Sequence, residues 1–375
     1  MMPDAAGIAL SAFSESYEQA REKFLVQAES VGADIQSYVH PSSFAAGGTP
    51  LALDTAWVGP RDAKHVMVMI SGTHGPEAYA GAAIQLNWLN SHKAFPSPSM
   101  AMLLIHGANP FGWAHCSRTT ENNVDLNRNF INHQQPHSLS PLVDHVQALL
   151  SASGAKGPRF MSVVLGLVKL LLRVGITKVV NEISNGQYSH PKGIGFGGNH
   201  AEWSNQTLTQ LLTEGLKQAD QVSIIDWHTG IGDYAEPCFL CFDAPDSEAY
   251  QRARNWWGEG VETSNANYAS GQRPDYQGLL INAARDIAQA AGAKTTSSVI
   301  EFGTYANHKM LKGLLIDRWL RCDADGASPE SIARLQEQVL RLFYPTDTQW
   351  RARVLEQGAR IVSQGLAGLS AEHTD

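Results

Sequence analysis

The feature that most constrains the fold is a series of short, continuous apolar runs, separated along the chain by segments with helical periodicity. These runs span residues 66–70, 100–105, 222–225, 239–242 and 298–300. Strands that are apolar on both faces occur in sheets that helices cover on both sides. The sequence therefore predicts an α/β protein with a central sheet buried between helices.

The chain of 375 residues contains no internal repeat and no low-complexity linker that would mark a domain boundary. Its length suits one large or two ordinary domains. An apolar helical pattern and a glycine-rich tract interrupt the alternation of strands and helices at about 132–205. We predict a single domain over residues 1–375, with an insertion at about 132–205 and a helical C-terminal tail at about 328–375.

The net charge of -8 and the pI near 5.9 do not suit a general nucleic-acid or anionic membrane surface. We therefore expect neither nucleic acid nor a membrane as a partner. Four scattered cysteines do not form a disulfide framework, and the N-terminus has no long apolar segment typical of a secretion signal. These features predict a cytoplasmic protein, and the sequence gives no indication of its oligomeric state.

Residues 160–180 form the most apolar long segment of the chain. Lys169, Arg173 and Lys178 interrupt it, whereas a membrane-spanning helix needs about 20 predominantly apolar residues in a row. The pattern predicts a partly buried or interfacial helix.

A histidine and a glutamate lie three residues apart in the stretch 71–77 (SGTHGPE), directly after the apolar run 66–70. The glycines and the proline of this stretch are typical of a turn, and residues 78–89 have helical periodicity. His74 and Glu77 could both bind zinc, which takes nitrogen and oxygen ligands. They could also be a loop histidine and a carboxylate that stabilises a helix N-terminus. The stretch alone leaves both interpretations open.

Polar residues capable of chemistry follow the other apolar runs as well. They are Asn109, Arg118 and the stretch 124–130 after the second run, Asp226 and His228 after the third, and Glu301 after the last. Open α/β sheets bind ligands outside the carboxyl ends of their strands. The sequence therefore predicts that these side chains meet at one edge of the sheet.

Taken together, the motifs resemble those of the zinc carboxypeptidase superfamily, which also includes succinylglutamate desuccinylase and aspartoacylase. The nearest branch is a bacterial group known as a domain of unknown function with predicted peptidase activity. The resemblance covers about residues 15–345. It is carried, in order, by SGTHGPE, NPFGW with SRTTENNVDLNRNF, GQY with GIGFGGN, DWHTGIG and EFGTY.

The resemblance implies a three-layer α/β/α fold with a central mixed, mostly parallel sheet of about eight strands. It also implies one Zn²⁺ ion, held by His74, Glu77 and His228. Two nitrogens, one carboxylate and an open position are the ligand set of a hydrolytic zinc site. Glu301 corresponds to the general base of the family.

The resemblance assigns further roles around this centre. Arg118 matches the arginine that supports the developing oxyanion, and Asn127 with Arg128 matches the pair that binds a substrate carboxylate. Asp125 matches a carboxylate that orients the first histidine ligand. From the residues alone, each arginine could instead be structural, with Arg118 neutralising Asp125 or the neighbouring Glu121.

Other positions remain open at this level. Asp226 shares a strand face with His228 and could neighbour it. Tyr276 is the candidate for the assisting phenol that binds substrate, with Tyr188 and Tyr268 as competitors. A second metal could bind near His133 and His137.

The implied activity is hydrolysis of an amide next to a free carboxylate. The substrate would be a small peptide, as for a metallocarboxypeptidase, or an N-acyl amino acid, as for a desuccinylase-type amidohydrolase. The second type usually carries a separate C-terminal barrel. Only 74 residues follow Glu301 here, and their pattern is mainly helical, which favours the carboxypeptidase. A catalytically silent binding protein on the same scaffold is a further alternative.

Overall fold

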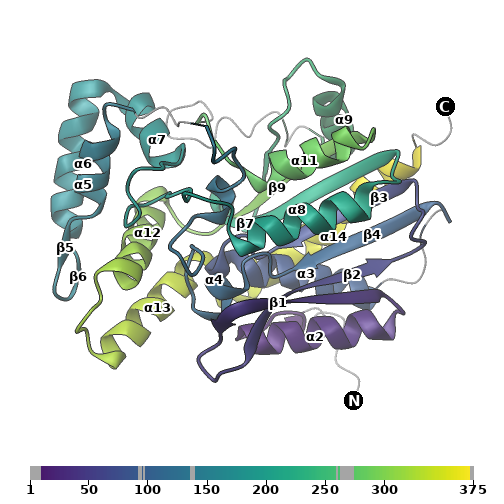
Figure 1. Ribbon diagram of the computed structural model, residues 1–375, viewed down its shortest axis with the longest axis horizontal. Coiled ribbons are helices and arrows are strands. Elements are labelled where there is room, and N and C mark those ends of the chain that lie inside the picture. The colour runs from purple at the N-terminus through teal and green to yellow at the C-terminus, as the bar shows by residue number, and fades with distance from the viewer. Residues whose placement is uncertain are drawn as a thin grey trace.

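The computed structural model describes residues 10–91, 95, 98–135, 140–258, 261 and 274–371. Within these residues the main sheet contains seven strands, shown in Figure 1. They are β1 (Asp34–Phe44), β2 (Pro50–Val58), β3 (His65–Ser71), β4 (Met100–His106), β7 (Gln221–Tyr234), β8 (Pro237–Leu240) and β9 (Lys294–Gly303). Their order across the sheet is β1-β2-β4-β3-β7-β9-β8.

The centre of the sheet is parallel and its margins are antiparallel. Strands β4, β3, β7 and β9 run parallel to one another. Strands β1 and β2 at one side and β8 at the other pair antiparallel. The predicted α/β fold is confirmed, and each of the five apolar runs overlaps a strand. Strands β1 and β2 were not predicted, because β1 is largely exposed and has no continuous apolar run.

Helices cover both faces of the sheet (Figure 1). One face packs against α2 (Tyr17–Ser30), α3 (Ala78–Ser91), α9 (Glu248–Trp257) and α14 (Thr348–Ala371). The other packs against α8 (Trp203–Leu216) and α11 (Leu280–Ala290). Along β3 the side chains alternate between the two cores, with Met67 and Met69 in the first and Val66, Val68 and Ile70 in the second. This alternation follows from the two-residue period of a strand.

A helical group lies beyond the carboxyl ends of the parallel strands, at the left of Figure 1. It contains α5 (Val143–Leu150), α6 (Phe160–Val174), α7 (Ile176–Ser184), α12 (Asn307–Cys322), α13 (Pro329–Phe343) and the small hairpin β5 (Ser153–Gly154) and β6 (Gly157–Pro158). Helices α5, α6 and α7 share a separate apolar core with Leu315 of α12. The proposed insertion over 132–205 and the single domain stay predictions.

Two predicted helical segments are divided in the structure. The segment 160–180 becomes α6 and α7, separated by Gly175, whose φ of 88° lies in the left-handed region that favours glycine. The predicted tail becomes α13 and α14. None of the described helices combines the length and the apolar character needed to cross a bilayer.

Candidate metal centre and substrate cavity

The turn after β3 positions His74 and Glu77. His74 is extended and precedes a short 3-10 helix, η1 (Gly75–Glu77), whose proline stands at its start. A Cβ atom on Gly75 would lie 1.9 Å from the carbonyl oxygen of Gly112 in α4 (Pro110–Ala114). Only glycine fits this contact, so the turn after β3 packs directly on the turn after β4.

Strands β7 and β9 supply the rest of the centre. His228 and Glu301 are partners in the register of these parallel neighbours, so both side chains lie on the sheet face that α8 and α11 cover. Asp226 precedes His228 by two residues and shares this face. Trp227, between them, packs into the opposite core.

Glu77 lies between the two histidines. Its Oε1 is 3.0 Å from Nδ1 of His74, and its Oε2 is 3.0 Å from Nδ1 of His228. All three side chains are buried, and each offers a ligand atom within 4.8 Å of the others. The structure therefore brings together the three residues that the resemblance assigns to zinc.

Both histidines are oriented in the same way by buried carboxylates. Nε2 of His74 lies 3.1 Å from Oδ1 of Asp125, and Nε2 of His228 lies 2.9 Å from Oδ2 of Asp226. The other oxygen of Asp226 accepts a hydrogen bond of 2.9 Å from Thr73. A carboxylate on Nε2 holds the proton there and leaves the Nδ1 lone pair for a metal. Asp226 thus orients His228 in the way that the resemblance implies for Asp125 and His74.

The chemistry of these donors fits zinc. Nδ1 of His74 is buried and forms no hydrogen bond among the described residues, its nearest charged neighbour being the Glu77 carboxylate at 3.0 Å, so in a neutral histidine its lone pair is available to a cation. Two imidazole nitrogens and one carboxylate oxygen are the donor set of a catalytic zinc site. We therefore regard His74, Glu77 and His228 as a candidate metal centre.

The ionisation of the centre also favours a cation. Against the effect of burial, the charge of His74 and the hydrogen bond from His228 hold the pKa of Glu77 well below its usual range. Burial lowers the pKa of His228, but the adjacent Asp226 outweighs it and raises this pKa well above its ordinary value. Both shifts mark a place where positive charge is stabilised.

Glu301 behaves in the opposite way. Burial, and then the negative charge of Glu77, raise its pKa to about 7. Its Oε2 accepts a long hydrogen bond of 3.4 Å from the backbone N–H of Ile231. A carboxyl with few donors around it and a pKa near neutrality is suited to take and release a proton.

The expected oxyanion residue, Arg118, lies beside the centre and is bound by it. Its Nη1 donates to Oε1 of Glu77 at 2.9 Å, and its Nε donates to Oδ2 of Asp125 at 3.2 Å. Arg118 therefore contacts Asp125, as the structural alternative proposed. It does not pair with Glu121, which lies 3.0 Å from His40 instead. A guanidinium has five N–H donors, so Arg118 retains donors that can face the cavity it lines.

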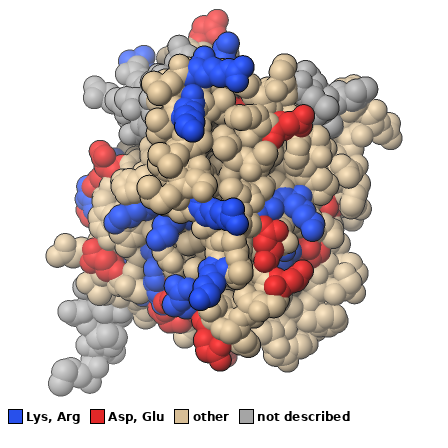
Figure 2. Space-filling model, turned by 90° about the vertical axis from the view of Figure 1, so that its left-hand side faces the viewer, with Lys and Arg blue, Asp and Glu red and all other residues tan. Residues whose placement is uncertain are grey.

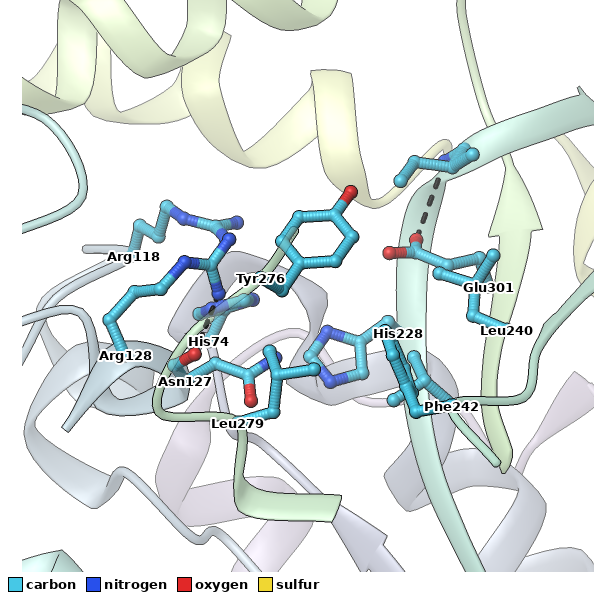
Figure 3. A pocket seen from close by; sticks show the side chains of 12 residues that line it. His74, Arg118, Asn127, Arg128, His228, Leu240, Phe242, Tyr276, Leu279 and Glu301 are labelled. Atoms are coloured by element: carbon cyan, nitrogen blue, oxygen red, sulfur yellow. Dashed lines mark hydrogen bonds between the residues drawn. The ribbon is translucent and has the colours of Figure 1, made fainter. Parts of the chain in front are cut away.

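A cavity of about 70 Å³ opens next to the centre, as Figure 3 shows. Its lining joins chemistry-bearing residues to an apolar wall. The polar members are His74, Arg118, Asn127, Arg128, His228, Tyr276 and Glu301, and the apolar members are Ile231, Leu240, Phe242, Leu279 and Val299. Apart from the recessed carboxylates Glu77 and Asp125, the structure thus places every predicted site residue on one cavity.

Arg128 is held over the cavity by backbone carbonyls. It belongs to the short 3-10 helix η2 (Leu126–Arg128). Nε and Nη2 donate to the carbonyl of Ser184 at 3.1 and 2.7 Å, and Nη1 donates to the carbonyl of Asn127 at 2.6 Å. These bonds use three of the five N–H groups, so two remain for a ligand. None of these hydrogen bonds goes to an acidic side chain, although the charge of Arg128 helps to lower the pKa of the nearby Asp125.

Asn127 is fixed by the start of α11. Its side-chain oxygen accepts a 3.0 Å hydrogen bond from the backbone N–H of Leu280, which leaves the amide nitrogen as the group that can donate to a ligand. Its own backbone N–H donates to Asp125 at 3.0 Å.

The competing tyrosines occupy different places. The ring of Tyr276 lies 4.9 Å from the guanidinium carbon of Arg128 and borders the cavity (Figure 3). The hydroxyl of Tyr188 donates to the carbonyl of Arg128 at 2.8 Å, so this tyrosine supports the arginine. Tyr268 lies outside the described residues. The geometry therefore favours Tyr276 as the phenol nearest to a bound substrate.

The described residues give no support for a second metal site near His133. His133 contacts the carbonyl of Asn129 at 3.0 Å through Nε2, and His137 lies outside the described residues. Among these residues, the three-donor group at His74, Glu77 and His228 is the one grouping whose geometry could hold an ion.

Sequence reasoning missed the apolar wall and the support of Arg128 by Ser184. Phe242 and Leu240 belong to a run that was assigned to a buried strand, and apolar residues in such a run give no sign of which ones border a cavity. The contact with Ser184 joins residues 56 positions apart, and no local pattern announces it.

Two comparisons of the sequence with known proteins bear on this site. Residues 13–357 match the family described as "Protein of unknown function (DUF2817)", and the chain belongs to this family. The match confirms the predicted branch, a domain of unknown function. A search of curated proteins gave no match.

Solved structures with a similar fold include several carboxypeptidases. Carboxypeptidase A from Helicoverpa armigera is 14% identical, with 87% of this chain and 73% of that chain covered and a TM-score of 0.45. Bovine thrombin-activatable fibrinolysis inhibitor is 12% identical, with coverage of 93% and 98% and a TM-score of 0.45. A metallo-carboxypeptidase from Burkholderia cenocepacia is 13% identical, with coverage of 96% and 71% and a TM-score of 0.39.

Proposed function

We propose that this protein is a zinc-dependent hydrolase of the metallocarboxypeptidase type, which cleaves an amide bond next to a free carboxylate. One observation carries the proposal. The two histidines of a three-donor metal group, a carboxyl with a pKa near 7 and an arginine with N–H groups to spare all border one small cavity. A metal, a base and a carboxylate receptor are the parts that this reaction requires.

Glu301 is the residue that moves the proton. When bound, zinc supplies a Lewis acid that makes water more acidic and polarises a carbonyl. The Glu301 carboxylate takes a proton from the attacking water and passes it to the nitrogen of the leaving amine as the C–N bond breaks. The pKa of Glu301 is about 7 in the metal-free site, and a bound cation would lower it, so that the group is a carboxylate able to accept the proton near neutral pH.

Arg128 and Asn127 recognise the leaving residue. Arg128 and the amide nitrogen of Asn127 are directed to its carboxylate, as a planar guanidinium suits two oxygens. Five apolar side chains form the adjoining wall. The leaving residue is therefore expected to carry an apolar side chain, because a charged one would be desolvated there without a partner.

Two alternatives to the peptidase stay open. A desuccinylase-type amidohydrolase would use the same metal group and base on an N-acyl amino acid. The silent-scaffold alternative predicts instead that the metal group and the base have no catalytic use.

A hydrolysis screen with metal-loaded protein tests the proposal. Purified protein is stripped with chelator, loaded with one equivalent of zinc and assayed on blocked dipeptides ending in leucine or phenylalanine, their C-terminal amides, and N-acyl amino acids. We expect metal-dependent cleavage of the dipeptides and little of the amides. Preferred cleavage of N-acyl amino acids would support the deacylase, and stoichiometric zinc without any hydrolysis would contradict both enzymes.

A further inference from the structure

Helix α6 exposes a row of large apolar side chains to solvent. Their exposed fractions are 66% for Met161, 57% for Leu165, 47% for Val168 and 85% for Leu172, and Ile176 at the start of α7 is 45% exposed. The spacing of four, three and four residues places the row on a single stripe of the helix. These positions make up most of the exposed large apolar side chains among the described residues, so the stripe is a local feature of one helix.

The stripe lies opposite the face that α6 buries. Val163, Leu167 and Leu170 point into the core shared with α5, α7 and Leu315. At 3.6 residues per turn, their mean direction is turned by about 180° from that of the exposed row. The internal packing of α6 is therefore complete without the outer stripe, whose apolar character needs another explanation.

The charged residues of the stretch that carries the stripe are all basic. Residues 145–181 contain no Asp or Glu. The basic residues of this stretch are all exposed: Lys156, Arg159, Lys169, Arg173 and Lys178. In Figure 2 the upper part of this face, over α6 and α7, is largely apolar or neutral, with Lys and Arg side chains above and below it. This local charge contrasts with the net charge of -8 for the whole chain.

The nearest acidic residues stand at the two ends of this stretch. Asp144 on α5 lies 3.4 Å from Nε2 of His190, and Glu182 lies near the end of α7. An apolar stripe with a basic flank is the composition of a helix that rests in the interface of an anionic bilayer.

The dimensions of α6 fit that placement. Its 15 residues extend about 22 Å at a rise of 1.5 Å per residue, which is shorter than the roughly 30 Å of a bilayer core. Its inner face is already held by the protein, so the outer stripe can lie in the plane of the membrane. Pairing of two copies through the stripe is disfavoured, because Lys169 and Arg173 of each copy would face basic residues with no acidic partner on the helix.

We propose that the outer face of α6, defined by Met161, Leu165, Val168 and Leu172 with Lys169 and Arg173, docks on an anionic lipid surface. This proposal differs from the expectation drawn from net charge alone, because a net charge averages over faces of different sign. The docking face is also linked to the cavity, because α7 ends at Ser184, whose carbonyl holds Arg128. The proposal does not depend on the hydrolase activity.

Vesicle flotation with the full chain tests the proposal. Vesicles of phosphatidylcholine alone are compared with vesicles of equal parts phosphatidylcholine and phosphatidylglycerol. We expect the protein to float with the anionic vesicles and to be released by high salt, because exposed charges are screened. The double variant Leu165→Gln/Leu172→Gln should lower partitioning about tenfold or more, since two apolar side chains leave the interface. Each of Lys169→Gln and Arg173→Gln should lower it about fivefold.

The matched control is Val26→Gln, on α2, whose side chain is 61% exposed but lies away from α6. It should float like the unaltered protein, and circular dichroism should show that all variants are folded. Failure of the unaltered protein to bind anionic vesicles would overturn the proposal, as would equal binding by the Leu165/Leu172 variant. A concentration-dependent dimer that this variant dissociates, without vesicle binding, would assign the stripe to a second copy instead.

Discussion

The two sides of the cavity are built in different ways. On the metal side, each histidine is held by a buried aspartate, and Glu77 links the two rings. On the substrate side, Arg128 is held by backbone carbonyls, and five apolar side chains complete the lining. The metal side comes mainly from parallel strands and the turns after them, whereas Arg128 and Tyr276 come from connecting segments.

This difference separates two requirements of the proposed reaction. The metal side must hold charges at fixed distances, which a hydrogen-bonded network of ionised groups does well. The substrate side must bind a substrate and then release a product. It therefore keeps N–H groups of Arg128 that make no hydrogen bond within the protein. Variants on the two sides should therefore fail in different ways.

The largest effect is expected at the junction of the two sides, from Glu301→Gln. The variant keeps the shape of the side chain but removes the base, so kcat should fall by about 10²–10⁴-fold. Zinc content, measured on the same preparation by elemental analysis, should be unchanged. Near-normal turnover would show that Glu301 does not transfer the proton.

The same position should govern the pH dependence of stability in metal-free protein. The pKa of Glu301 is raised from 4.5 to about 7 in the folded state, so between these values the folded chain binds a proton that the unfolded chain has released. Stability is therefore lost as the pH rises from 4.5 to about 7. Glu301→Gln avoids this loss, and should be more stable than the unaltered protein above pH 7 by about 3 kcal/mol. Urea denaturation at several pH values measures the difference, which should vanish at acidic pH.

The third effect tests the metal side alone. Asp226→Asn and Asp125→Asn each replace the carboxylate on a histidine Nε2, and should weaken zinc binding about 10–100-fold. Competition with a chromogenic chelator provides the affinity. Glu202→Gln is the matched control, since Glu202 is equally buried but bonds Thr120 and Asn122. A similar loss in this control would indicate general destabilisation.

The smallest effect is expected on the substrate side, from Arg128→Lys. Lysine keeps the charge but loses the planar fork, so KM for substrates with a free carboxylate should rise about tenfold, with little change in zinc affinity. C-terminal amides, which lack the carboxylate, should be cleaved at an unaltered rate. An equal change for both substrates would remove the role of Arg128 in carboxylate binding.

The sequence predicted the parallel centre of the fold better than its margins. The apolar runs at 66–70, 100–105 and 222–225 each lie within a strand, because burial on both faces leaves a continuous apolar signal. Strands β1 and β2 contain polar residues and so lack the continuous apolar run that identified the other strands. Strand β1 is also mostly exposed. The division of 160–180 at Gly175 depends on a local left-handed backbone, which a single glycine in an apolar segment does not announce.

For the site, residues next to strand ends were predictable and tertiary contacts were not. His74, His228 and Glu301 stand in motifs at those ends, and the sheet brings them to one edge. The role of Asp226 was only suggested by its spacing from His228. The apolar wall and the support of Arg128 by Ser184 depend on packing between distant segments, for which the sequence has no local sign.

The register of β7 and β9 has a consequence for how the site can change. His228 and Glu301 are paired across neighbouring strands, so their separation follows the spacing of the sheet, about 4.8 Å between backbones. Side-chain substitution cannot adjust that separation gradually. Deleting one residue of β9 ahead of Glu301 would turn the carboxylate to the opposite face of the sheet. The backbone spacing beneath the base and the metal ligand thus changes only in whole steps of register, and a chain that drifts in sequence keeps it as long as it keeps the sheet.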